Sequence, residues 1–256
     1  MKRHPTPRIR YDDALRKTVG LVLAGMIFWL GAERAEAISI RVSQETSPGN
    51  SVFKVLGYIT PFDGLGQTAA QYYDYGGVGG NAASYGNTNA STILAADTTS
   101  LFTVNTQEGL SLFVVHSAPN VPASNGIADM QFNLAGGNAD ILAHDDPVTD
   151  PQDIYSGSAG GTVFTSHHVW QGGNTDGLAI GPLGNAFPTY AEFTAPPSGL
   201  NAWVAISNGG STIPLVLESG LHVRLDLVPE PSTFVLGIAG LAGLGFVAKR
   251  KVLRLA

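Results

Sequence analysis

The segment Asp129-Met130-Gln131-Phe132-Asn133-Leu134 decides the fold class, because apolar and polar side chains alternate along it with a period of two. In a β-strand this spacing places Met130, Phe132 and Leu134 on one face and the polar residues on the other. The same alternation returns near the end of the body, where the apolar side chains are Leu221, Val223, Leu225 and Leu227. Both segments are therefore predicted to be half-buried strands.

The rest of the body repeats this pattern in short runs separated by turn residues. Clusters such as 135–138 (Ala-Gly-Gly-Asn) and 208–211 (Asn-Gly-Gly-Ser) are typical of tight turns. No long amphipathic helix is apparent between residues 38 and 228, so we expect an all-β domain, an antiparallel β-sandwich or a jelly roll. Residues 72–92, rich in Gly, Asn and Tyr, are expected to form a long surface loop. The other candidate strands are 51–60, 101–105, 110–116, 162–170, 190–194, 201–207 and 212–218.

The N-terminal 37 residues have the order of a secretory signal peptide. A region with six basic residues up to position 17 precedes the apolar stretch 19–30, which we expect to be helical. Ala35 and Ala37 then supply the small-x-small pattern that signal peptidase requires, so cleavage is expected after Ala37. There is no Arg-Arg pair, which favours the general secretory route. The alternative is an uncleaved signal anchor.

The C-terminal residues combine a short motif, an apolar segment and a basic end. Pro229, Glu230 and Pro231 are followed by the apolar run 233–248 and then by Lys249, Arg250 and Lys251. As a helix, residues 232–248 would span roughly 25 Å, against about 30 Å of hydrocarbon in a bilayer. The basic residues are expected to stay in the cytoplasm, which places the body of the chain outside.

This tail resembles the PEP-CTERM sorting signal, which exosortases recognise in Gram-negative bacteria that make extracellular polysaccharide. With the resemblance of the tail, the chain divides into a predicted signal peptide (1–37), an exported β-sandwich domain (38–227) and a sorting signal (228–256) with a transmembrane helix at 233–248. The resemblance also implies transient residence in the inner membrane, processing by an exosortase, and delivery to the cell surface or a biofilm matrix. The alternative is a plain C-terminal membrane anchor that is never cleaved.

Charge and cysteine content narrow the function further. Residues 38–231 hold only three basic side chains against sixteen acidic ones, which excludes binding to nucleic-acid phosphates. An acidic polysaccharide would also be repelled unless divalent cations bridged it to the protein. The chain has no cysteine, so it forms no disulfide and performs no thiol chemistry.

Catalytic motifs are missing from the sequence. It contains no Gly-x-Ser-x-Gly, no phosphate-binding loop and no His-Glu-x-x-His. We therefore expect a non-catalytic, structural or adhesive protein that needs no cofactor. A secreted hydrolase is a third interpretation, and it would require paired carboxylates facing one cleft.

One acidic cluster has the composition of a calcium site. Carboxylates in a Pro-containing loop can bind calcium together with backbone carbonyls. Asp residues are equally common in such turns because they bond to their own backbone, so a purely structural cluster is the alternative. The residues of this predicted calcium site are Asp145, Asp146, Asp150 and Asp153, with Asp176 from a second loop.

Two adjacent histidines and several aromatic residues are the remaining candidates for a binding site. His167 and His168 would point to opposite faces of a strand, so we expect one solvated and one packed histidine and no joint chelation. Aromatic side chains could instead form a platform for sugar rings, which makes a calcium-assisted carbohydrate-binding module the second functional interpretation. Its candidates are Trp170 and Trp203, expected in the core, Tyr72, Tyr73 and Tyr75, expected to be exposed, and Tyr190.

Overall fold

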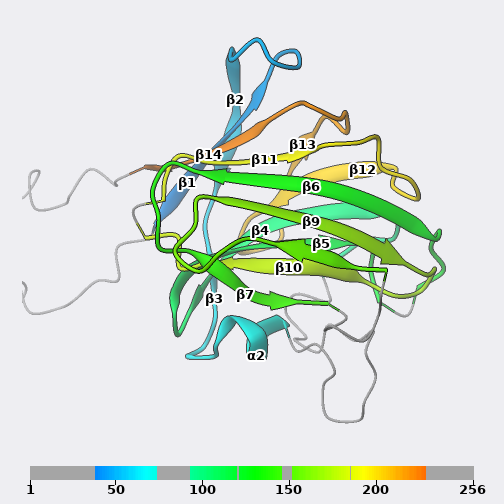
Figure 1. Ribbon diagram of the computed structural model, residues 1–256, viewed down its shortest axis with the longest axis horizontal. Coiled ribbons are helices and arrows are strands. Elements are labelled where there is room, and N and C mark those ends of the chain that lie inside the picture. Colours follow the sequence, from blue (N-terminus) through cyan, green and yellow to red (C-terminus); the bar gives the residue numbers. More distant parts are fainter. Residues whose placement is uncertain (1–37, 74–92, 120, 146–151, 185, 229–256) are drawn as a thin grey trace, which may run out of the picture. The chain divides into compact units, whose positions relative to one another are not determined.

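A computed structural model of the chain describes residues 38–73, 93–119, 121–145, 152–184 and 186–228 (Figure 1). The predicted signal peptide, the Pro-Glu-Pro motif, the segment 233–248 and the basic end lie outside these residues, as do Tyr75, Asp146 and Asp150. Within the described part, no helix is long and apolar enough to cross a bilayer.

The described residues form two seven-stranded sheets. The first sheet has the order β2-β1-β14-β11-β6-β9-β8, with bounds β2 (Phe53–Ile59), β1 (Ser39–Glu45), β14 (Val223–Val228), β11 (Thr189–Phe193), β6 (Gly126–Leu134), β9 (Val163–Trp170) and β8 (Ile154–Ser156). The second has the order β13-β12-β4-β5-β10-β7, with β3 beside β4; their bounds are β13 (Thr212–Leu215), β12 (Ala202–Ile206), β4 (Thr98–Thr106), β5 (Gly109–His116), β10 (Asp176–Gly181), β7 (Asp140–His144) and β3 (Phe62–Asp63). The all-β prediction is confirmed.

The sheets are not entirely antiparallel, which corrects the sequence prediction in one respect. β12 runs parallel to β4, and the two-residue strand β3 also pairs with β4 in parallel. The physical reason is connectivity. The chain enters β12 from β11, which belongs to the first sheet, so no hairpin fixes the direction of β12 relative to its neighbour.

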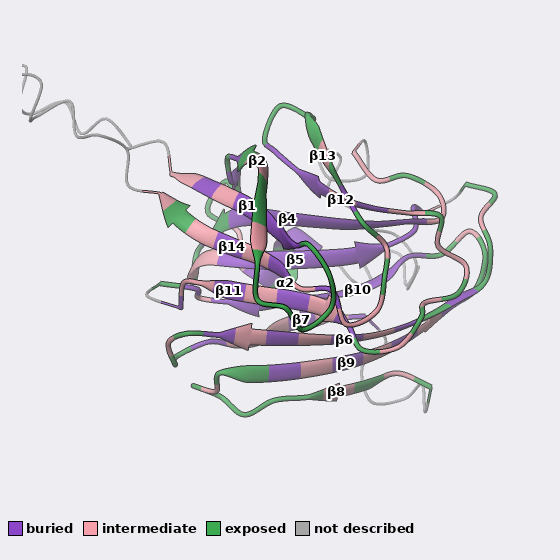
Figure 2. Ribbon diagram, turned by 90° about the horizontal axis from the view of Figure 1, so that it is seen from above, coloured by how far each residue is buried: buried purple, intermediate pink, exposed green. Residues whose placement is uncertain are grey.

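The main core lies between the two sheets and is built from the predicted alternation. Met130 and Phe132 of β6 and Val223 and Leu225 of β14 belong to one buried cluster that also contains residues of the second sheet, such as Val114. Buried segments accordingly run along the inner strands, whereas the edge strands β2 and β8 consist mainly of exposed and half-buried residues (Figure 2). Leu227 differs from the prediction: it is exposed, because it lies at the end of β14 beyond the core.

A second apolar cluster covers the other face of the second sheet. The helix α2 (Ala69–Tyr73) begins after Thr68, whose hydroxyl accepts a hydrogen bond from the Gln71 N–H as an N-cap does. Tyr72 packs edge-on against Phe113, and Tyr73 stacks on the same ring. The expectation that Tyr72 and Tyr73 are exposed is therefore wrong: both side chains are buried. The helix that carries them lies beside β7 (Figure 1).

Candidate functional site

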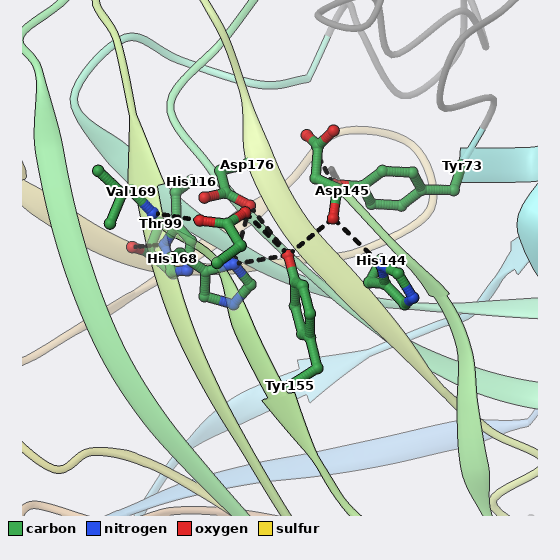
Figure 3. Close-up of polar contacts among 10 residues, drawn as sticks. Tyr73, Thr99, His116, His144, Asp145, Tyr155, His168, Val169 and Asp176 are labelled. Atoms are coloured by element: carbon green, nitrogen blue, oxygen red, sulfur yellow. Dashed lines mark hydrogen bonds and ion pairs between the residues drawn. The ribbon is translucent and has the colours of Figure 1, made fainter. Parts of the chain in front are cut away.

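A buried polar cluster lies where β8 and β9 of the first sheet approach β10 of the second. Its centre is the Tyr155 hydroxyl, which lies 3.0 Å from the backbone oxygen of Asp145 (Figure 3). The same hydroxyl is 3.2 Å from Asp153 Oδ2 and 3.4 Å from both His168 Nδ1 and Asp176 Oδ1. One phenol thus faces two carboxylates, an imidazole and a carbonyl, and its single proton can be donated to only one of them.

Strand alternation and strand pairing bring these residues together. In β9 every second side chain is buried, which turns His168 and Trp170 inward and leaves His167 outside. Asp176 is the first residue of β10 and lies opposite His116 of β5. The His116 ring stacks on Trp170 at 5.2 Å and meets the His168 ring edge-on at 4.7 Å.

The electrostatic pairing in the cluster is tight. His168 Nδ1 lies 2.8 Å from Asp176 Oδ1, and both side chains are almost completely enclosed. Burial alone would raise the pKa of Asp176, but the charge and the hydrogen bond of His168 outweigh it and hold this pKa below its ordinary value. Burial lowers the pKa of His116 well below the ordinary value, so this ring is neutral.

Asp153 and Tyr155 are perturbed in the opposite direction. Burial and the neighbouring Asp176 charge raise the pKa of Asp153 to about 7. Burial also raises the pKa of Tyr155, helped by the charges of Asp176, Asp153 and Asp145, so the phenol keeps its proton. Shifted groups of this kind gather at functional sites, although structural networks produce them too.

The structure places three of the five predicted calcium ligands in this cluster. Asp153 and Asp176 contribute carboxylates, and Asp145 contributes its backbone oxygen, while its own carboxylate lies 3.4 Å from the Tyr73 hydroxyl. Asp153 also accepts the Val169 N–H at 2.9 Å, which is a structural role of the kind the turn interpretation predicts. His144, next to Asp145, stacks on the Tyr155 ring at 4.6 Å.

Sequence reasoning missed the residues that complete the cluster. Tyr155 and His116 were not candidates. Of His167 and His168 one was expected to be solvated and one packed, and the structure packs His168. The one available signal was the alternation in 163–170, which predicts an inward His168. The partners across the two sheets depend on strand order, which the sequence does not reveal.

A second candidate is an open groove on the outer face of the first sheet, with a volume of about 380 Å³. Its walls include Phe53 and Tyr190, whose rings flank the Arg224 guanidinium at 5.7 and 5.9 Å. His222 lies between two carboxylates, with Nδ1 at 2.8 Å from Glu45 and Nε2 at 3.2 Å from Glu192. Of the predicted aromatic platform, Tyr190 lines this groove, whereas Trp170 and Trp203 are buried in the core as expected.

Residues 227–251 match the family described as the PEP-CTERM protein-sorting motif. The tail of this chain is a PEP-CTERM motif. It implies export to the cell envelope or surface and processing by an exosortase. The match covers the tail alone, and the body of the chain is not recognised.

The match to the PEP-CTERM motif begins inside the last strand of the folded body. Its first two residues, Leu227 and Val228, are also the last two of β14, and Val228 pairs with Ser39 at the start of β1. Pro229 has no backbone N–H and cannot donate to a further ladder bond. The motif therefore begins at the point where the described sheet ends.

Comparison with other proteins adds little about the body. No curated protein matches the chain. One solved structure does, titled as an uncharacterized protein from Nocardia farcinica with an immunoglobulin-like fold, at 16% identity and a TM-score of 0.25. The match covers 46% of this chain and 83% of that one, and a similarity this low does not establish a shared fold.

Proposed function

We propose that the chain is a non-catalytic exported protein whose β-sandwich serves at the cell surface or in an extracellular matrix. On this proposal, signal peptidase removes residues 1–37, the segment 233–248 holds the chain transiently in the inner membrane, and an exosortase processes the tail. The observation that carries the proposal is the sorting motif at 227–251, which begins inside the last strand of the body.

The pairing of the first and last strands is compatible with cleavage of the chain on both sides of the body. β1 and β14 are antiparallel neighbours from Ser39↔Val228 to Gln44↔Val223. Removing residues 1–37 and those from Pro229 onward would delete no described strand from either sheet. The trimmed domain would retain its whole described core.

The chemistry of the buried cluster supports a non-catalytic body. Asp153 and Asp176 are the paired carboxylates that a hydrolase would need, but both face the Tyr155 hydroxyl and Asp176 is buried. A polymer substrate has no access to a carboxylate enclosed in this way.

The proposal is tested by the intact mass of the protein from its native host, measured in each cell fraction. The wild type should lack both the leader and the residues after the motif, and should be recovered from the surface or the matrix. Glu230→Gln should retain the tail and accumulate in the inner membrane. Glu218→Gln is the matched control, because Glu218 is an exposed glutamate of the body. A wild-type protein with a full-length C-terminus in the inner membrane would contradict the proposal.

The groove on the first sheet supports a second function, a carbohydrate-binding module. Aromatic faces beside a few hydrogen-bonding groups are typical of small-ligand sites, and Phe53, Tyr190, Asn133 and His222 provide both here. Tyr190→Ala should then abolish binding to a glycan array, whereas Tyr58→Ala, at an exposed tyrosine outside the groove, should not. Of the five predicted calcium ligands, Asp145, Asp153 and Asp176 lie in the buried cluster and do not line the groove, so glycan binding in the groove should survive a calcium chelator. Equal glycan binding by both variants would exclude the groove.

A further inference from the structure

We propose that Asp153, His168 and Asp176 bind a divalent transition-metal ion, with Zn²⁺ as the reference ion, and that this site ties the two sheets together. Asp153 precedes β8 and His168 lies in β9, both in the first sheet, whereas Asp176 begins β10 in the second. The inference goes beyond the sorting function and does not depend on it.

The donor atoms lie close enough together to converge on one small ion. One donor atom from each of the three residues lies within 4.8 Å of the other two. In a tetrahedral zinc site with bonds of about 2.0–2.1 Å to nitrogen and oxygen, donor atoms are roughly 3.3–3.4 Å apart. The Tyr155 hydroxyl oxygen stands 3.2, 3.4 and 3.4 Å from Asp153 Oδ2, His168 Nδ1 and Asp176 Oδ1, so it lies beside all three residues. His168 Nδ1 and Asp176 Oδ1 form a hydrogen-bonded pair at 2.8 Å, and they would separate by about 0.5 Å to share the ion.

A buried carboxylate oxygen without a partner points independently to a ligand. Asp176 Oδ2 has no hydrogen-bond partner among the described residues, although only 2% of the residue is exposed. Leaving a charged oxygen unsatisfied in this way is costly, and an ion bound at the carboxylate removes the cost. Figure 3 shows this carboxylate, the His168 ring and the Tyr155 hydroxyl directed at one another.

Two carboxylates converge in the cluster, and the body offers few basic side chains that could balance them when both are ionised. The body has three basic residues in all, Arg41, Lys54 and Arg224. The two arginines pair with Asp226 and Lys54 lies in β2, at the edge of the first sheet opposite β8. No lysine or arginine of the body is therefore placed beside the cluster, and a bound cation would supply the balancing charge.

The nitrogen ligand selects the kind of ion. Calcium takes six to eight oxygen ligands, whereas a set of one imidazole and two carboxylates suits zinc and its neighbours in the first transition row. A transition-metal ion accounts for His168 as well as for the two aspartates. The calcium interpretation leaves the histidine without a role.

The test is a metal titration of the full-length chain in detergent, after stripping with a chelator that is then removed. Calorimetry should give one Zn²⁺ per chain, and a hundredfold excess over the dissociation constant should raise Tm by roughly 5–10 °C. Co²⁺ in the same site should show the visible bands of tetrahedral coordination. Calcium at the same concentrations should displace neither ion.

Adjacent histidines provide the matched control. Asp153→Asn and His168→Gln should each weaken Zn²⁺ binding by more than about 10-fold, since even groups that only orient a ligand contribute that much. His167→Gln should leave the affinity unchanged, because His167 faces outward from the same strand. Asp153 is only half-buried, so its variant remains informative if the His168 variant does not fold.

Three results would overturn the proposal. The first is a folded wild type that binds no Zn²⁺. The second is an affinity that Asp153→Asn leaves intact or that His167→Gln lowers equally, since the ion would then sit elsewhere. The third is displacement of Zn²⁺ by calcium at similar concentrations, which would indicate a site made of oxygens alone.

Discussion

Two adjacent histidines make the same chemical pair in opposite surroundings. His167 Nδ1 lies 2.6 Å from Asp129 Oδ1 on the outer face of the first sheet, and 33% and 37% of these side chains are exposed. His168 Nδ1 lies 2.8 Å from Asp176 Oδ1 between the sheets, where the exposed fractions are 0% and 3%. The two pairs have nearly equal distances and differ mainly in access to water.

Access to water determines what each pair contributes to folding. In the exposed pair, water solvates either partner when the other is removed, so little free energy depends on the contact. In the buried pair, removing one partner leaves the other charged or polar group without a substitute. The distance in a histidine–carboxylate pair is therefore a poor guide to its importance, and its burial is a good one.

The largest expected effect comes from His168→Ala, measured without metal. The substitution strands the Asp176 carboxylate in the interior, which typically costs about 3–5 kcal/mol of the free energy of unfolding. Urea unfolding of the chelator-treated chain measures the loss. In the double variant His168→Ala, Asp176→Leu the loss should be markedly smaller, because no unpaired charge remains. A double variant that loses the sum of both single effects would contradict the unpaired-charge explanation.

The second effect concerns the hydroxyl at the centre of the buried cluster. Tyr155→Phe removes the hydroxyl that faces Asp145 O, Asp153 Oδ2 and Asp176 Oδ1 while keeping the ring on His144. Leaving a buried acceptor unsatisfied costs about 1–3 kcal/mol, so thermal unfolding should show a loss of this size. Tyr58→Phe on an exposed strand should stay within about 0.5 kcal/mol of the wild type. An equal loss of unfolding free energy in both variants would mean that the hydrogen bonds of the Tyr155 hydroxyl do not stabilise the fold.

Glu45 and His222 form a third pair of intermediate kind, in which the carboxylate is enclosed and the imidazole is partly exposed. Burial alone would raise the pKa of Glu45, but hydrogen bonds from the His222 side chain and from the Ser51 and His222 backbone, with the His222 charge, lower it below its ordinary value of 4.5. A carboxyl group with a lowered pKa adds stability above its unfolded pKa and loses it as the pH falls through the folded one.

Glu45→Gln should therefore flatten the decline of the unfolding free energy below about pH 4.5, which is the unfolded value. Denaturant unfolding at several acidic pH values measures the slope, and the exposed Glu218→Gln provides the control. The same slope in the wild type and Glu45→Gln would show that the pair contributes nothing to acid stability.

The alternation of apolar and polar residues predicted the fold class, because each strand buries one of its own two faces. The segment 129–134 and most of 221–227 alternate as their sheet requires, and the inward face of each can be read without knowing its neighbours. The burial of Tyr72 and Tyr73 was not predicted because the helix that carries them shows no periodic pattern. Thr68 caps a helix of only five residues, too short to show a 3.6-residue period, so its burial against Phe113 left no pattern in the sequence.

The buried cluster was predicted only in part because its members are joined across sheets. Asp153 and Asp176 were chosen for their carboxylates, but their contact with Tyr155 depends on β9 of the first sheet approaching β10 of the second. His116 enters through pairing with Asp176, and Trp170 can lie flat on it because the residue opposite, Gly126, has no side chain. Contacts between strands that are far apart in the sequence do not change the spacing of residues within each strand, so the sequence pattern does not reveal them.

His167→Ala should have the smallest effect and so provides the strictest check on the comparison. An exposed pair typically contributes between about 0.2 and 1 kcal/mol, and salt screens it further. The loss measured by urea unfolding should therefore lie below about 1 kcal/mol at low salt and shrink toward zero as salt is added. Asp129→Asn should behave in the same way, because it removes the same contact from the other side. A loss as large as that of His168→Ala would show that position in the strand, and not burial, sets the weight of a histidine–aspartate pair in this sheet.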